Sequence, residues 1–190
     1  MTQPDAKEDL VRYLQVVREA VVWKLDGLSE YDLRRPMTPT GTNLLGLVKH
    51  LASVEAGYFG DTFDRPFPEP PAWSEDDSSS DMWVTADETA EFIIGYYRRV
   101  WEHADETIAT LSLDDIGHVP WWPAERNEVT LHRILVHVIA ETNRHAGHMD
   151  IVREMIDGVA GLREEVTNLW VPDGGWEAYR DRLEQIARNA

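Results

Sequence analysis

Glu141 and His145 stand four residues apart in the second half of the chain. Residues at this spacing share one face of a helix. His148 continues that face three residues later, and His137 precedes Glu141 by four. A carboxylate and imidazoles are costly to bury unless they pair or bind a metal ion. The pattern therefore predicts either part of a metal site or a hydrogen-bonded pair of polar side chains.

A second polar interruption occurs at His50, which lies beside the apolar residues Leu47 and Leu51. Facing helices of a bundle can bring one histidine of this segment to a Glu and a His of the later one. Two imidazole nitrogens and one carboxylate oxygen are a common ligand set for a catalytic divalent ion, and they leave positions open for water or substrate. The candidate metal ligands are His50, Glu141 and His145. The same spacing can also be interpreted without a metal: Glu141 and His145 would then be a surface pair, and His50 an ordinary core histidine.

Four segments show the apolar periodicity of amphipathic helices. They cover about residues 5–28, 42–63, 85–111 and 130–157. The third opens with Thr85-Ala-Asp-Glu88, a capping-box pattern, and Gly158 is placed to end the fourth. Strand signals are weak throughout. Four helices with one apolar stripe each pack most simply as an antiparallel bundle, so we predict an all-α fold.

The stretches between these segments carry the turn residues. Residues 65–83 contain four prolines and three consecutive serines, which predicts a long surface loop between the second and third helices. A loop is also expected over 29–41. The tail should form a short helix over about 176–187. We therefore expect one four-helix bundle over residues 1–160, with residues 161–190 as a C-terminal extension packed on it.

Composition restricts the partners and the chemistry. The chain has 190 residues, enough for one domain, with 35 acidic against 18 basic residues and a formal charge of -17. This charge repels phosphate backbones and anionic membrane surfaces, so we expect no nucleic acid or membrane partner. There is no cysteine, so any thiol chemistry needs an external thiol. The polar N-terminus and the lack of a long apolar run predict a cytoplasmic protein.

Two segments together resemble a known superfamily. The stretch from Asn43 to Phe59, which includes NLLGLVKHLASVE, and the stretch from Thr130 to Ile151, which includes ETNRHAGH, resemble the second and fourth helices of the DinB-like superfamily. The Glu-Thr-x-Arg-His-Ala-Gly-His sequence is similar to that of one of its branches. The resemblance covers about residues 5–160. It implies a four-helix bundle with a His-rich metal site between helices.

The resemblance also implies a ligand set. The family's helix-two histidine matches His50, and the two family histidines on the fourth helix fall at Glu141 and His145. A His/Glu/His trio is similar to that of the mycothiol-dependent maleylpyruvate isomerases, which bind zinc. Glu141 departs from the usual histidine, so His148 is an alternative third ligand; Glu141 is preferred because it occupies the family's ligand position. Zinc is the expected ion, with nickel, manganese and iron as alternatives.

The function implied by the resemblance is that of a metal-dependent transferase or isomerase. It would use a small-molecule thiol such as mycothiol and an electrophilic substrate, and the resemblance also suggests a homodimer. Arg144 could hold a substrate carboxylate, or simply face solvent. Trp121 and Trp122 could roof an apolar pocket over the metal, or pack in their loop. Two alternatives stay open: a metal-dependent hydrolase that activates water, and a non-catalytic, stress-linked binding protein.

Overall fold

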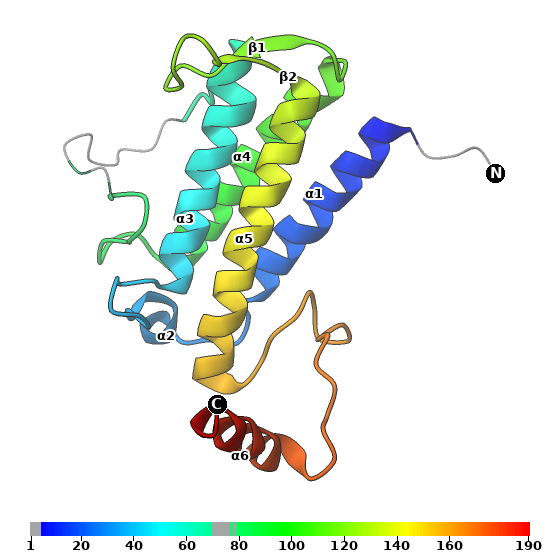
Figure 1. The fold of residues 1–190 in the computed structure, drawn as a ribbon. Helices are drawn as coiled ribbons and strands as arrows, with labels where there is room; N and C mark the ends of the chain where they lie inside the picture. Colours follow the sequence, from blue (N-terminus) through cyan, green and yellow to red (C-terminus); the bar gives the residue numbers. More distant parts are fainter. Residues whose placement is uncertain (1–4, 70–76, 78) are drawn as a thin grey trace.

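Four long helices lie side by side in the computed structural model, which describes residues 5–69, 77 and 79–190 (Figure 1). They are α1 (Ala6–Trp23), α3 (Leu44–Glu55), α4 (Ala90–Thr110) and α5 (Leu131–Asp157). α1 packs mainly against α5, and α3 packs mainly against α4. The predicted all-α bundle is therefore confirmed. Within the described residues, no helix combines the length and the apolar character that a membrane span requires.

The four helices form two parallel pairs that run antiparallel to each other. Lys49, in α3, contacts Glu88 just before α4, whereas Arg65, after α3, donates a hydrogen bond to Thr107 near the end of α4. α3 and α4 therefore point the same way, and Figure 1 shows the same for α1 and α5. This arrangement requires the chain to return along the bundle between α3 and α4. The predicted long connection falls between these two helices, and its residues 70–76 and 78 lie outside the described residues.

The helix boundaries follow local sequence signals to different degrees. α5 matches its prediction, since the Thr130 side chain accepts a hydrogen bond from the backbone N–H of Arg133, and Gly158 ends the helix at φ 78°. α4 begins five residues later than expected, with Thr89 as its cap. The Glu88 carboxylate does accept the backbone N–H of Thr85, at 2.7 Å, but this bond closes a turn rather than a helix.

Five short elements of the described residues were not predicted. α2 (Glu30–Arg34) interrupts the expected loop over 29–41. The end of the second predicted helix changes type: α3 passes into a π-helical turn, η1 (Ala56–Gly60), and a 3₁₀ turn, η2 (Asp61–Phe63). β1 (Ile116–His118) and β2 (Glu128–Thr130) pair in antiparallel fashion before α5. Strands of three residues are too short to show alternation in a sequence.

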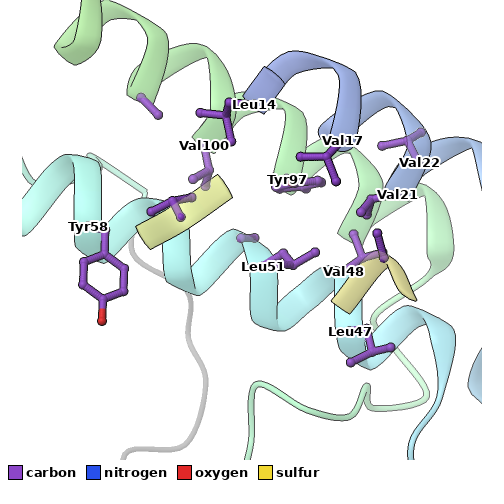
Figure 2. Packing of buried hydrophobic residues seen from close by; sticks show 14 of the residues in the cluster. Leu14, Val17, Val21, Val22, Leu47, Val48, Leu51, Tyr58, Tyr97 and Val100 are labelled. Carbon is purple, nitrogen blue, oxygen red and sulfur yellow. The ribbon is translucent and has the colours of Figure 1, made fainter. Parts of the chain in front are cut away.

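The core lies between the four helices. Figure 2 shows part of it, including Leu14, Val17, Val48, Leu51, Tyr97 and Val100. One buried polar group joins three helices: Arg18 of α1 donates to Glu55 of α3 and to Asp105 of α4. The Tyr97 hydroxyl donates to Glu55 at 3.0 Å. Pairing of this kind makes the burial of such charges tolerable.

The C-terminal helix α6 (Gly175–Arg188) follows a loop after α5 (Figure 1). Its bounds agree with the short helix expected over about 176–187. None of its residues is buried. The expectation that residues 161–190 pack on the bundle stays a prediction.

Candidate metal centre

His50 on α3 faces Glu141 and His145 on α5. Nε2 of His145 lies 2.9 Å from Oε1 of Glu141, and Nε2 of His50 lies 3.7 Å from the same oxygen. The two imidazole rings are 4.8 Å apart, nearly edge to face. Among the described residues, these three form the one group of at least three possible ligands whose donor atoms all lie within 4.8 Å of one another.

Helix packing explains why these side chains converge. Thr142 and Met149, on either side of His145 along α5, are fully buried, and His145 itself is only 7% exposed. The Thr142 hydroxyl donates its hydrogen to the carbonyl of Val138, so this hydrogen does not occupy a donor atom of the three candidate ligands. His50 and Glu141 are part-buried. The cluster is thus walled by protein on one side and reachable from solvent on the other.

Asp81 orients the His50 ring. The Nδ1–H of His50 donates to Oδ2 of Asp81 at 2.7 Å, which leaves Nε2 directed toward Glu141. Histidines that bind metals commonly donate their other N–H to a carboxylate in this way. Sequence reasoning missed Asp81, because it is one of several acids in the connection between the second and third helices. The rule that a ligating histidine needs a carboxylate partner could have suggested such a residue without identifying it.

The ionisation of the cluster reflects these contacts. Burial lowers the pKa of His50, but the hydrogen bond and charge of Asp81, with help from Glu141, raise it above its usual value. Burial lowers the pKa of His145, and the nearby His50 adds to this effect against the opposing influence of Glu141. Burial raises the pKa of Glu141, but the hydrogen bond from His145 and the positive charges around it hold that pKa below its usual value.

The donor set fits a divalent ion. An ionised carboxylate and neutral imidazoles are the metal-binding forms of these side chains. Glu141 supplies the carboxylate, and the lowered pKa of His145 favours its neutral form. Nδ1 of His145 is buried and has no hydrogen-bond partner among the described residues. Of these two histidines, His50 donates its Nδ1–H to a carboxylate outside the cluster, whereas the carboxylate bonded to His145 is Glu141, a member of the cluster.

The other predicted residues lie around this group. His148 is exposed, and its ring is 5.3 Å from that of His145. Arg144 is also exposed, and its charge contributes to the lowered pKa of Glu141. His137 packs edge-on against Tyr58, with ring centroids 4.6 Å apart, instead of pairing with Glu141. None of these three side chains belongs to the converging group.

A pocket of about 430 Å³ opens beside the cluster. It is lined by His50, Ser53, Val54, Tyr58, Trp121, His137 and Glu141. Trp121 thus covers part of a pocket next to the candidate ligands, as one of the two interpretations of the tryptophan pair predicted. Trp122 lies deeper, in edge-on contact with Tyr58 and His137, and does not line this pocket.

A comparison with protein families gives one match. The sequence model described as Mycothiol-S-transferase matches residues 9–158. This range contains all three converging side chains and Asp81, and it stops where α5 ends. No curated protein matches the chain.

Proposed function

The chain belongs to the Mycothiol-S-transferase family, and from this premise we propose that it is a metal-dependent transferase that joins a low-molecular-weight thiol, such as mycothiol, to an electrophilic substrate. One observation supports the metal dependence: donor atoms of His50, Glu141 and His145 converge, and His50 and Glu141 also line a pocket large enough for a small molecule. The metal-bound form is expected to contain zinc, since two nitrogens and one oxygen are a common set for it.

His50, Glu141 and His145 would hold the ion. A bound divalent cation supplies Lewis acidity, which lowers the pKa of a thiol or a water molecule in its open position toward neutrality. Asp81 keeps His50 in the tautomer that has Nε2 free of hydrogen. Glu141 contributes one negative charge, so the site keeps a net positive charge that favours a thiolate.

Bonds, electrons and protons balance in the proposed transfer step. The thiol sulfur forms a bond to the electrophilic carbon, the leaving group departs with the electron pair of the broken bond, and the thiol proton passes to solvent. The protein has no cysteine, so no thiol of its own competes for the electrophile or the metal. Val54 and Trp121 line the pocket and would shield one side of the reacting atoms from water.

The first experiment measures bound metal and thiol transfer in the same preparations. Purified wild type, His50→Ala, Glu141→Ala and His145→Ala are subjected to elemental analysis and then assayed with mycothiol and iodoacetamide. We expect near-stoichiometric metal and thiol transfer in the wild type, and loss of both in the three variants. His132→Ala is the matched control, because this histidine is exposed on the same helix as Glu141; it should behave as wild type.

Other outcomes decide between the alternatives. Metal that survives in Glu141→Ala but is lost in His148→Ala would make His148 the third ligand. Turnover of an ester without any thiol, together with no thiol transfer, would favour the hydrolase. A wild type that binds no metal after reconstitution with zinc, nickel, manganese or iron contradicts the proposal and favours a non-catalytic binding protein.

A further inference from the structure

The pocket beside the metal cluster has two chemically different ends. His50 and Glu141 form the polar end, and Val54, Tyr58 and Trp121 form an aromatic end where His137 packs against Tyr58; Ser53 completes the lining. The thiol belongs at the polar end in the proposed function, because that is where the ion would activate its sulfur. The aromatic end is therefore the part of the pocket that remains for the second substrate.

Trp121 is held in place by a glycine and by the π-helical turn of η1. A Cβ atom on Gly57 would lie 2.7 Å from Cη2 and 3.3 Å from Cζ3 of Trp121, so the indole rests directly on the backbone of this residue. The Tyr58 ring meets the indole edge to face, with centroids 5.1 Å apart. A π-helical turn is rare in proteins and often marks a functional site. Here it presents Gly57 and Tyr58 together to the tryptophan.

The two aromatic side chains differ in exposure. Tyr58 is 9% exposed, and Figure 2 shows its ring directed away from the other labelled core side chains. Trp121 is 52% exposed, although it lies in a loop closed by the hydrogen bond from Val119 to Asn127. A large aromatic side chain that is fixed on one side and open on the other is suited to bind a flat apolar group.

The charge around the pocket excludes one class of substrate. None of the described residues that line it is a lysine or an arginine, and Glu141 is acidic. The chain as a whole carries a formal charge of -17. Away from the proposed ion, an anionic substrate would meet no lysine or arginine among these lining residues, and the imidazole of His137 is the ionisable group beside the aromatic side chains. Arg144, the candidate to hold a carboxylate, is exposed and does not line the pocket.

We propose that Trp121 and Tyr58 form the subsite for the electrophile, and that this electrophile is an uncharged aromatic compound with a leaving group on the ring. This inference rests on the proposed function for the role of the metal end. In the step concerned, the thiol sulfur bonds to the ring carbon, the leaving group departs with its electron pair, and the thiol proton goes to solvent. The indole and the phenol ring hold the aromatic plane but exchange no electrons with it.

The test begins with equilibrium binding, which needs neither thiol nor turnover. Calorimetry measures the Kd of 1,3-dinitrobenzene, a neutral and unreactive probe, for the zinc-treated protein. Trp121→Ala should weaken binding about tenfold, because the probe loses one aromatic contact and the area buried in it. Gly57→Ala should weaken it comparably, because the new methyl group displaces the indole, whereas Trp121→Phe should retain most of the affinity. Trp170→Ala, which removes an equally exposed tryptophan outside the pocket, should have no effect.

The second measurement compares electrophiles in turnover. The ratio of kcat/KM for 1-chloro-2,4-dinitrobenzene to that for iodoacetamide should fall about tenfold in Trp121→Ala and stay unchanged in Trp170→Ala. Unchanged probe affinity in both Trp121→Ala and Gly57→Ala would overturn the inference, as would equally tight binding of the anion 3,5-dinitrobenzoate. If the wild type transfers no thiol but binds the probe through Trp121, the proposed function fails while the aromatic subsite stands.

Discussion

At the scale of single residues, the geometry of the candidate centre depends on which nitrogen of His50 carries the proton. Asp81 accepts the Nδ1–H of His50, and the hydrogen bond from this imidazole holds the pKa of Asp81 below its usual value. The carboxylate is therefore ionised and keeps Nε2 available as an electron-pair donor. A residue outside the ligand set thus controls how well His50 can bind a metal.

This arrangement predicts the effect of Asp81→Asn. The amide can still contact Nδ1 but has no charge, so it fixes the tautomer less firmly. We expect the affinity for zinc to fall about 10- to 100-fold, the usual range for loss of such a partner. Competition with a coloured chelator measures it. Asp87→Asn, at an exposed acid in the same connection, should bind zinc as wild type does; equal affinities in all three proteins would show that Asp81 has no such role.

The three candidate ligands could be named from the sequence because each lies on a helix. The spacing of residues along a helix determines the direction in which their side chains point, so Glu141 and His145 had to share a face. His50 likewise had to interrupt the apolar stripe of the helix that faces them. Spacing could not separate Glu141 from His148, which lies on a similar face three residues from His145. Asp81 was beyond reach, because a loop residue has no periodicity and its position depends on contacts made far along the chain.

At the scale of elements, hydrogen bonds and close backbone packing attach the last part of the connection between α3 and α4 to α3. The Nζ of Lys49 donates to the carbonyl of Trp83 and to the Glu88 carboxylate, both at 3.0 Å. The carbonyl of Met82 lies so close to Gly46 that a Cβ there would be 2.0 Å away. The segment after Asp81 is therefore seated on the first turns of α3. This seating brings Asp81 to His50, one turn further along.

Glu88 gives this attachment a pH dependence. Burial raises the pKa of Glu88, but the backbone N–H of Thr85 and the ammonium of Lys49 hold it below the ordinary value of 4.5. A carboxyl whose pKa is lower in the folded chain stabilises that state above the unfolded-state pKa, and this stabilisation is lost as the pH falls through the folded-state value. The contribution should be complete at neutral pH and be lost progressively as the pH falls below 4.5, through the lower pKa of the folded state.

Glu88→Gln tests this dependence in the metal-free protein, so that loss of an ion does not contribute. At pH 7 we expect the variant to lose about 1 kcal/mol of unfolding free energy, since its hydrogen bonds are no longer charge-assisted. The difference from wild type should shrink as the pH falls below 4.5. Urea unfolding at several pH values measures it, with Glu125→Gln, at an exposed loop residue, as control. A difference that is constant with pH would contradict the role of the charge.

Long helices could be predicted from the sequence more completely than short elements. α5 has 27 residues with clear caps, and both of its ends were predicted. The α-helical part of the second predicted helix stops at Glu55, whose carboxylate is held by Arg18, and the π-helical turn follows at once. Apolar periodicity continues through such a change, because a single wide turn shifts the pattern by only one residue. The π-helical turn that presents Gly57 and Tyr58 therefore escaped prediction, although Trp121 was named as a candidate to cover the pocket.

At the scale of the whole molecule, the candidate metal site connects two helices that are far apart in the chain. His50 lies on α3, and Glu141 and His145 lie on α5, so the full ligand set exists only when the bundle is folded. The family match covers the bundle and ends where α5 ends. The residues assigned roles in the proposed function, His50, Asp81, Trp121, Glu141 and His145, all lie within this range. The homodimer expected from the resemblance stays a prediction.

Because the ligand set exists only in the folded chain, metal removal should lower the melting temperature. A ligand present at 100 times its Kd adds about 2.7 kcal/mol to the stability of the state it binds. In a chain of this size, that amount raises the Tm by roughly 5–10 °C. We expect this difference between zinc-saturated wild type and protein stripped by a chelator, measured by circular dichroism. His50→Ala should melt at the same temperature with and without zinc, whereas His132→Ala should respond as wild type does. Identical melting of wild type in both conditions would mean that the three converging side chains are a hydrogen-bonded group without a metal, as the alternative interpretation of their spacing proposed.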